Sequence, residues 1–322
     1  MIGRKQSYHG ISLGALAVGG HKARRDPFRD NLMEVRHAMP CDSYRGQGQD
    51  ESDEGYVTRL IDDMEAQIRN AGEDRVAGVI IEPIVGAALG CMPPVSGYLQ
   101  AVRDLCDRYD LLLIFDEIMC GMGRSGTYYH AWQHENVAPD ILLTGKGMAA
   151  GHFPISGMLI NREIYHVMES VGGFNHGQTF ENYPLACAAA LAVLNIIDEQ
   201  KLLKNTSEMG ELLMKRLKAE ILPLPHVGHV RGGGLFLGLE FVKDKLLKES
   251  FGAADEISLS IARLGLDEFN IQFYPCGRSN GKDGDYLIIA PAFNIDEDHV
   301  EIIVSRLKAL LTAFFSDFKA IR

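Results

Sequence analysis

Three residues with reactive side chains each follow a short apolar segment of the sequence. The segments are VAGVII (76–81), LLLIF (111–115) and DILLTG (140–145). Glu82 follows the first, Asp116 the second and Lys146 the third, at intervals of 34 and 30 residues. Short runs rich in Val, Ile and Leu are typical of buried parallel strands, and this interval suits one strand–helix–strand unit. Because open α/β sheets bind ligands at the carboxyl ends of their strands, we expect the three side chains in one crevice.

A neutral lysine beside carboxylates can act as a nucleophile and carry a proton. A carboxylate that follows five apolar residues, as Asp116 does, is costly to bury without a cationic partner. If Lys146 is neutral or forms an imine, Asp116 needs a different cation, and a protonated pyridine nitrogen is a suitable one. Enzymes that use pyridoxal 5'-phosphate (PLP) make this pairing, which lets the ring accept electrons. The three residues therefore favour a PLP site.

The surrounding residues predict the elements that position these side chains. Apolar side chains at helical spacing predict amphipathic helices over 58–72, ending at Gly72, and over 96–110, with Ser96 as the N-cap. Residues 111–115 predict a strand buried on both faces. Alternating strands and helices of these lengths indicate an α/β fold with a mostly parallel sheet.

The pattern changes after about residue 200. There we expect helices over 206–222, 254–268 and 296–315, strands over 235–242 and 285–291, and turns over 223–234. The organisation is then a large domain over 1–200, which ends in a long buried helix at 182–200, and a smaller C-terminal α+β domain over 201–322.

The composition excludes several classes of protein. Of the 322 residues, 46% are hydrophobic and 23% charged, which is an ordinary globular balance. The net charge of −11, from 32 Lys and Arg against 43 Asp and Glu, argues against nucleic acid or an anionic membrane as the main partner. No apolar run reaches the roughly 18 residues of a membrane span, and the start of the chain lacks a signal-peptide core. Six scattered cysteines without a CxxC pair suit free thiols in a cytoplasmic protein.

Several motifs, in order along the chain, carry a family resemblance. They are SYHG (7–10), GVIIEPIVGAALGCMPP, LLLIFDEIMCGMGRSGTYYHAW, APDILLTGKGMAAGHFPISGML, HGQTFENYPLACAAALAVL and RGGGLFLGLEF (231–241). The sequence from residue 7 to about residue 316 resembles class III PLP-dependent aminotransferases. The resemblance implies fold type I and a homodimer with shared active sites. It also implies ping-pong transfer of an amino group from a small amine or amino-acid donor to an oxo-acid or aldehyde acceptor.

The resemblance further implies a set of cofactor-binding residues, two of them catalytic. The set is Lys146, Asp116, Ile118, Tyr8, His9, Glu82 and Thr179. Lys146 would be the Schiff-base lysine and the proton carrier, and Asp116 would pair with the pyridine nitrogen. Ile118 and Tyr8 would pack on opposite faces of the ring.

Glu82 would lie near the ring edge, and Thr179 would reach the phosphate of the neighbouring subunit's cofactor. The family pattern includes an upstream segment with a Gly-Ser/Thr turn that holds this phosphate. Because the sequence begins just before SYHG, we expect that phosphate site to be absent. Many relatives also place an arginine before the last strand to receive a substrate carboxylate, but Tyr274 stands about there, with Arg278 beyond it. The sequence therefore leaves ω-amine or bulky amine donors open.

Other motifs give competing interpretations. GMGRSG (121–126) matches the dinucleotide pattern GxGxxG, but acids precede it and no clear helix follows. His130 and His134 have a spacing found in metal sites, but without further ligands we expect structural roles and no metal. We expect His229 in a turn and the acidic cluster 50–55 in a solvated loop. Two kinds of alternative function remain. The chain could be an aminomutase or a decarboxylase, or a non-catalytic truncated subunit that acts through its dimer surface.

Overall fold

The structure, a computed structural model, describes residues 1–321 and the side chains of residues 1–316. Its larger sheet has six strands in the order β2-β1-β3-β4-β5-β6. They are β1 (Ile2–Arg4), β2 (Arg36–Ala38), β3 (Gly78–Ile81), β4 (Leu112–Asp116), β5 (Ile141–Thr144) and β6 (Gly157–Ile160). The first five strands in this order, from β2 through β1 and β3 to β5, are parallel, and β6 runs antiparallel to β5. The expected mostly parallel sheet is confirmed, and it has three further strands, β1, β2 and β6, that the sequence analysis did not predict.

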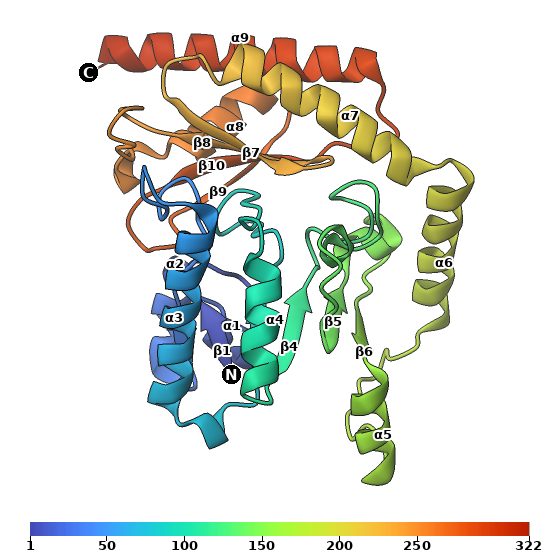
Figure 1. Ribbon diagram of the computed structural model, residues 1–322. Helices are drawn as coiled ribbons and strands as arrows, with labels where there is room; N and C mark the ends of the chain where they lie inside the picture. Colours follow the sequence, from blue (N-terminus) through green and yellow to red (C-terminus); the bar gives the residue numbers. More distant parts are fainter. Residues whose placement is uncertain (322) are drawn as a thin grey trace.

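Helices α3 (Asp53–Ala71) and α4 (Tyr98–Arg108) lie side by side across one face of this sheet (Figure 1). Their apolar stripes share one core with alternate strand residues such as Leu113 and Phe115. The remaining helices of this half are α1 (Leu13–Val18), α2 (Lys22–Arg25), α5 (Arg162–Ser170) and α6 (Pro184–Glu199). Short 3-10 turns cover Asp26–Asn31, Glu73–Arg75, Ala131–His134 and Lys146–Ala149.

The starts of α3 and α4 differ from the prediction. Ser52 caps α3, because its Oγ accepts a 3.1 Å hydrogen bond from Gly55 N, so the acidic cluster 50–55 supplies the first helical turn as well as a loop. Acids in this position stabilise the helix dipole. Gly97, at φ +81°, precedes α4 in place of the expected cap Ser96, whose side chain makes no capping bond.

The opposite face of the sheet and helix α6 are less covered than the sequence suggested. Leu112 of β4 is 37% exposed, so that strand is not buried on both faces. Helix α6 contacts α7 and the turn Lys146–Ala149, and stands apart from the sheet in Figure 1. Its Leu185 and Leu191 are 60% and 59% exposed. The prediction of a buried helix over 182–200 is therefore wrong for this chain, since no described element packs on that side.

The C-terminal part holds a four-stranded antiparallel sheet in the order β7-β8-β10-β9. Its elements are α7 (Leu202–Arg216), a π turn (Leu217–Ile221), β7 (Val227–Gly233), β8 (Phe236–Phe241), a 3-10 turn (Ala253–Asp255), α8 (Ile257–Glu268), β9 (Tyr274–Gly277), β10 (Asp285–Ile289) and α9 (Glu297–Ile321). Helices α7 and α9 cross the top of the molecule in Figure 1 and pack on each other. The expected turn region 223–234 is mostly strand β7, because its glycine-rich end still pairs with β8.

A small apolar cluster joins the two sheets. It contains Ile84, Cys91 and Cys120 from the first half of the chain, with Phe236 and Ile288 from the second. All six cysteines are free thiols. Within residues 1–321, no helix combines the length and the apolar character needed to cross a membrane.

Candidate active site

Glu82, Asp116 and Lys146 lie at the carboxyl ends of three adjacent parallel strands. Glu82 follows β3, Asp116 is the last residue of β4, and Lys146 stands two residues beyond β5. In the sheet register, Asp116 pairs with Leu143 of β5, so the ends of these strands lie at one edge. Asp116 and Glu82 both act electrostatically on the Lys146 amine.

Asp116 is buried and held from two sides. The Nδ1 atom of His9 lies 2.9 Å from Asp116 Oδ2, and the backbone N–H of Ile118 donates to Oδ1 at 3.1 Å. His9 is also buried, and its second ring nitrogen, Nε2, has no partner among the described residues. Each carboxylate oxygen keeps a further lone pair, so Asp116 can still accept a proton donor from a ligand.

Glu82 is buried and fixed by backbone groups from two segments. Its Oε1 accepts from Tyr8 N and its Oε2 from Gly86 N, each at 2.9 Å. Arg4 Nη2 donates to the main-chain oxygen of Glu82 at 2.6 Å. Burial raises the pKa of the Glu82 carboxyl, and neighbouring Asp116 adds to this effect, while the two backbone bonds oppose it.

Lys146 occupies an unusual backbone conformation. Its φ is +37°, in the region that non-glycine residues avoid, at a cost of about 1–3 kcal/mol. Lys146 is an exposed residue, but partial loss of hydration lowers the pKa of its amine below the ordinary value. Asp116 and Glu82 act in the opposite direction, and Arg24 adds to the lowering. A larger share of neutral amine follows, which suits a nucleophile or a base.

Comparison with known proteins identifies the family of the chain. The sequence profile of aminotransferase class-III matches residues 1–311. The chain belongs to the class III aminotransferase family.

Among its relatives is an aminotransferase of Gibberella zeae, 40% identical over 311 residues, which cover 95% of this chain and 61% of the relative. An uncharacterized aminotransferase of Schizosaccharomyces pombe is 38% identical, over 97% of this chain and 68% of the relative. The solved (S)-enantioselective omega-transaminase of Thermomicrobium roseum superposes with a TM-score of 0.89 at 32% identity, over 97% of this chain and 67% of the other. This class III aminotransferase sequence thus spans about three fifths to two thirds of the length of these proteins.

Three further site residues that the family resemblance predicted, Ile118, Tyr8 and Thr179, differ in how buried they are. Ile118 is half-buried. Its side chain lies beside the residue before Lys146, because a Cβ atom added to Gly145 would be 3.7 Å from Ile118 Cγ1. Tyr8 is half-buried, with the Arg24 guanidinium 4.3 Å from the centre of its ring. Thr179 is exposed in the segment between α5 and α6. Among the described residues, no hydrogen bond joins Thr179 to the rest of this class III chain.

Arg231 and Ser279, from the C-terminal part of the chain, hold the loop that follows Glu82 by three consecutive main-chain oxygens. Ser279 Oγ donates to Ala88 O at 2.5 Å. Arg231 donates from Nε to Leu89 O and Gly90 O, each at 3.0 Å, and from Nη2 to Leu89 O at 2.6 Å. Because Gly86 of the same loop donates to Glu82, these contacts link the C-terminal part of the chain to the segment that holds the Glu82 carboxylate. Sequence reasoning missed both Arg231 and Ser279.

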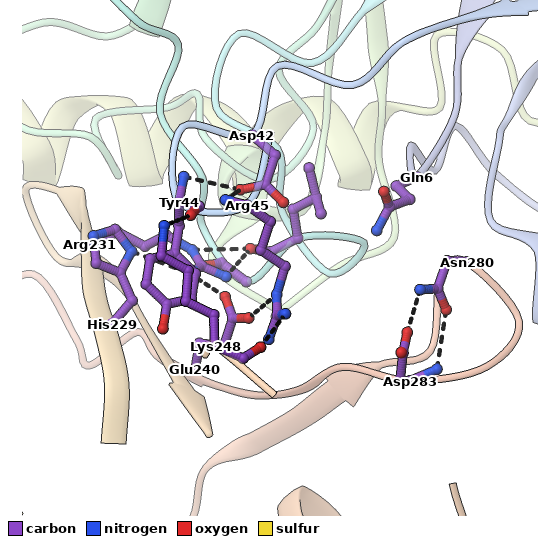
Figure 2. A network of polar contacts seen from close by, with 12 residues as sticks. Gln6, Asp42, Tyr44, Arg45, His229, Arg231, Glu240, Lys248, Asn280 and Asp283 are labelled. Atoms are coloured by element: carbon purple, nitrogen blue, oxygen red, sulfur yellow. Dashed lines mark hydrogen bonds and ion pairs between the residues drawn. The ribbon is translucent and has the colours of Figure 1, made fainter. Parts of the chain in front are cut away.

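A buried ion-pair network secures Arg231 (Figure 2). Glu240 bridges two arginines, with Oε2 2.5 Å from Arg231 Nη1 and Oε1 2.5 Å from Arg45 Nε. His229 stacks on Tyr44, with ring centres 4.7 Å apart and planes 8° from parallel. His229 therefore lies in β7 and contacts Tyr44 of the N-terminal part of the chain, which corrects the expected turn.

The competing motifs also have structural roles here. Residues 121–130 form turns and no helix, so GMGRSG lacks the helix start that a dinucleotide fingerprint requires. Glu117 is buried and accepts from Ala131 N and Trp132 N, and the Nδ1 atom of His130 lies 3.3 Å from its Oε2. His134 packs edge-on against Tyr128.

Proposed function

We propose that this chain carries out PLP-dependent transamination between a small amine or amino-acid donor and an oxo-acid or aldehyde acceptor, in two half-reactions. The observation that carries the proposal is the convergence of Lys146, Asp116 and Glu82 at one sheet edge, with Lys146 in a strained backbone conformation. Membership in the class III aminotransferase family supports it. When bound, PLP supplies a ring that accepts electron density from the substrate carbon.

The described residues fit the ring end of this cofactor. The buried carboxylate of Asp116 has only His9 as a possible cationic partner among its contacts, and His9 Nε2 is buried without an acceptor. Asp116 would hold the proton of the pyridine nitrogen, with His9 and Ile118 N fixing its orientation. Tyr8 and Ile118 would pack on the ring faces, and Glu82 would lie at its edge.

Lys146 would bind the cofactor through Nζ and, once released by the donor, move the proton on and off the substrate carbon at the same atom. The lowered pKa of its amine supports this role, because only the neutral form accepts a proton. Asp116 and Glu82 act electrostatically on the amine, and their negative charge would stabilise it after it has taken the proton.

We also propose a cytoplasmic homodimer in which Thr179 of each subunit completes the partner's phosphate site. The exposed apolar side chains of segment 171–191 support a covered surface here; they are Val171, Phe174, Phe180, Leu185 and Leu191. We place the domain boundary at residues 200/201, because the larger sheet ends at Ile160 and the smaller begins at Val227. Analytical ultracentrifugation tests the dimer, and a monomer at micromolar concentration would contradict it.

The test of the function is covalent labelling. The purified chain is incubated with PLP, reduced with borohydride, digested and mapped by mass spectrometry. We expect the pyridoxyl group on Lys146 and its loss in Lys146→Ala, while the exposed control Lys215→Ala keeps it. Label spread over surface lysines, or turnover retained by Lys146→Ala, would overturn the proposal.

A second measurement identifies the reaction type. An amine donor should release a carbonyl product and leave an aminated cofactor. Addition of a 2-oxo acid should then restore the starting absorbance spectrum of the cofactor. Release of carbon dioxide from the donor, or conversion of the donor to its isomer without an acceptor, would contradict transamination.

A further inference from the structure

A pocket of about 220 Å³ opens between the two domains beside Lys146. Its lining is chiefly apolar, with Met119 from the large domain and Phe236, Ile288 and Phe293 from the small domain. Its two charged lining residues are Lys146 and Arg124. A ligand that enters this pocket therefore meets the reactive amine and one guanidinium group.

Arg124 is anchored in this pocket by its neighbours. Its Nη1 donates to Leu235 O at 3.2 Å and to Pro291 O at 2.5 Å, both in the small domain. Its guanidinium carbon lies 4.3 Å from the centre of the Phe293 ring. The planar group is thus held at one end and on one face, which fixes its orientation before any ligand binds.

Arg124 has no acidic partner in the described part of the chain. Its Nε and Nη2 groups donate to no residue there, although a guanidinium offers five N–H donors in a planar fork. Burial without a compensating carboxylate lowers the pKa of Arg124 to about 10. By contrast, Arg231 and Arg45 share Glu240, and each has a raised pKa.

Arg124 is half-buried, and a cation that has lost part of its hydration is costly unless an anion accompanies it. Two neutral carbonyl oxygens satisfy Nη1 but leave the positive charge uncompensated, so a purely structural link between the domains explains only part of the arrangement. Carboxylate and sulfonate oxygens match the remaining fork of donors. Tyr274, which stands about where many relatives carry an arginine, lines the same pocket and adds no positive charge.

We propose that Arg124 binds the anionic group, a carboxylate or a sulfonate, of the compound whose amine or carbonyl carbon reacts at Lys146. This inference rests on the proposed function, and it adds a substrate class and a specificity-determining residue. The pocket suits a compound with an acidic group at one end, for Arg124, and the reacting amine or carbonyl group at the other, for Lys146. The rest of the lining is chiefly apolar.

Direct binding of unreactive probes tests the inference without turnover. Isothermal titration of the PLP-loaded protein uses butyrate, propane-1-sulfonate and the neutral isostere butyramide. We expect at least one of the two acids to bind more tightly than the amide, by about tenfold or more, as charge-assisted hydrogen bonds to a half-buried arginine predict. Equal affinity for acids and amide would overturn the inference even where the cofactor label is on Lys146, so its failure is distinct from failure of the proposed function.

Substitutions identify the residue responsible. Arg124→Gln should remove the preference for acids over the amide, whereas Arg124→Lys should keep part of it. The control Arg306→Gln removes an arginine that also donates to a carbonyl, Asn270 O, but lies on exposed surface. Loss of acid and amide binding together, with label still on Lys146, would show a structural role and contradict the inference. If Arg124→Gln does not fold, the comparison of probes on the unmodified protein decides.

Discussion

His9 Nδ1 lies 2.9 Å from Asp116 Oδ2, and the second nitrogen of the same ring is buried without a partner. These residues are 107 positions apart, so only the folded sheet brings them together. The contact fixes one oxygen of Asp116, and Ile118 N fixes the other. The carboxylate is therefore oriented before any ligand arrives, which is the usual requirement for an electrostatic role in catalysis.

Asp116→Asn tests that role. The amide keeps the size of the side chain but removes the charge that would hold a proton on the cofactor ring. We expect label on Lys146 to persist and the rate of the first half-reaction to fall by about 10²–10³-fold. Rapid-mixing absorbance with an amine donor measures this rate. Asp62→Asn, on exposed helix surface, is the matched control, and a near-normal rate in Asp116→Asn would refute the assignment.

His9→Ala removes the side-chain partner of a buried carboxylate. A buried polar group without its partner costs about 1–3 kcal/mol, so the free energy of unfolding should fall by that amount. Urea unfolding followed by circular dichroism gives the value. His299→Ala breaks an exposed His–Asp contact with Asp296 and should change stability far less. Equal effects of the two variants would show that burial does not strengthen the His9 contact.

Arg231→Ala should be among the most destabilising single changes in the chain. It leaves Glu240 buried with one of its two arginines and removes the donors to Leu89 O and Gly90 O. Breaking a buried ion pair costs about 3–5 kcal/mol, which denaturant unfolding can measure. Arg216→Ala, which breaks a surface pair with Glu220, should have a much smaller effect. A comparable loss in both variants would contradict this account.

Stability should fall in mild acid because three histidines are buried or half-buried. Burial, aided by nearby arginines, lowers the pKa of His21, His37 and His229 to about 4. Unfolded histidine has a pKa of about 6.5, so between about pH 6.5 and about pH 4 the unfolded chain binds more protons than the folded one. The free energy of unfolding therefore decreases as the pH falls through this window.

His229→Asn tests the contribution of one of these residues. The slope of unfolding free energy against pH, measured between about pH 5 and about pH 6.5, should be shallower than in the unmodified chain. His166→Asn, an exposed residue of α5, should leave the slope unchanged. An identical slope in His229→Asn would mean that this histidine titrates alike in both states.

The strand ends could be predicted from sequence because local signals determine them. Apolar runs of four to six residues marked β3, β4 and β5, and a charged residue followed each run. His9 has no comparable local signal, and only the SYHG resemblance pointed to it. Arg231 and Glu240 did have one: a hairpin that turns at Gly234 pairs Arg231 with Gly238, so Glu240 becomes its diagonal neighbour on the same face.

Each wrong prediction has its own physical cause. Helix α6 is rich in Ala and Leu, which indicates burial, but a sequence pattern does not say whether the covering surface lies within the described chain. Ser96 is a good capping residue by type, but the neighbouring Gly97 takes the left-handed turn that starts α4. Strand β7 contains three glycines, and its pairing with β8 outweighs their weak preference for strands.

The left-handed backbone at Lys146 has a consequence for selection. Glycine adopts such a φ without steric cost, so a chain selected for stability alone would favour glycine at this position. Lys146→Gly should therefore raise the melting temperature of the cofactor-free protein while it removes the amine. Natural proteins often accept reduced stability at positions that perform chemistry. Position 146 is such a compromise, and variants evolved for thermal resistance without selection for activity should lose the lysine there early.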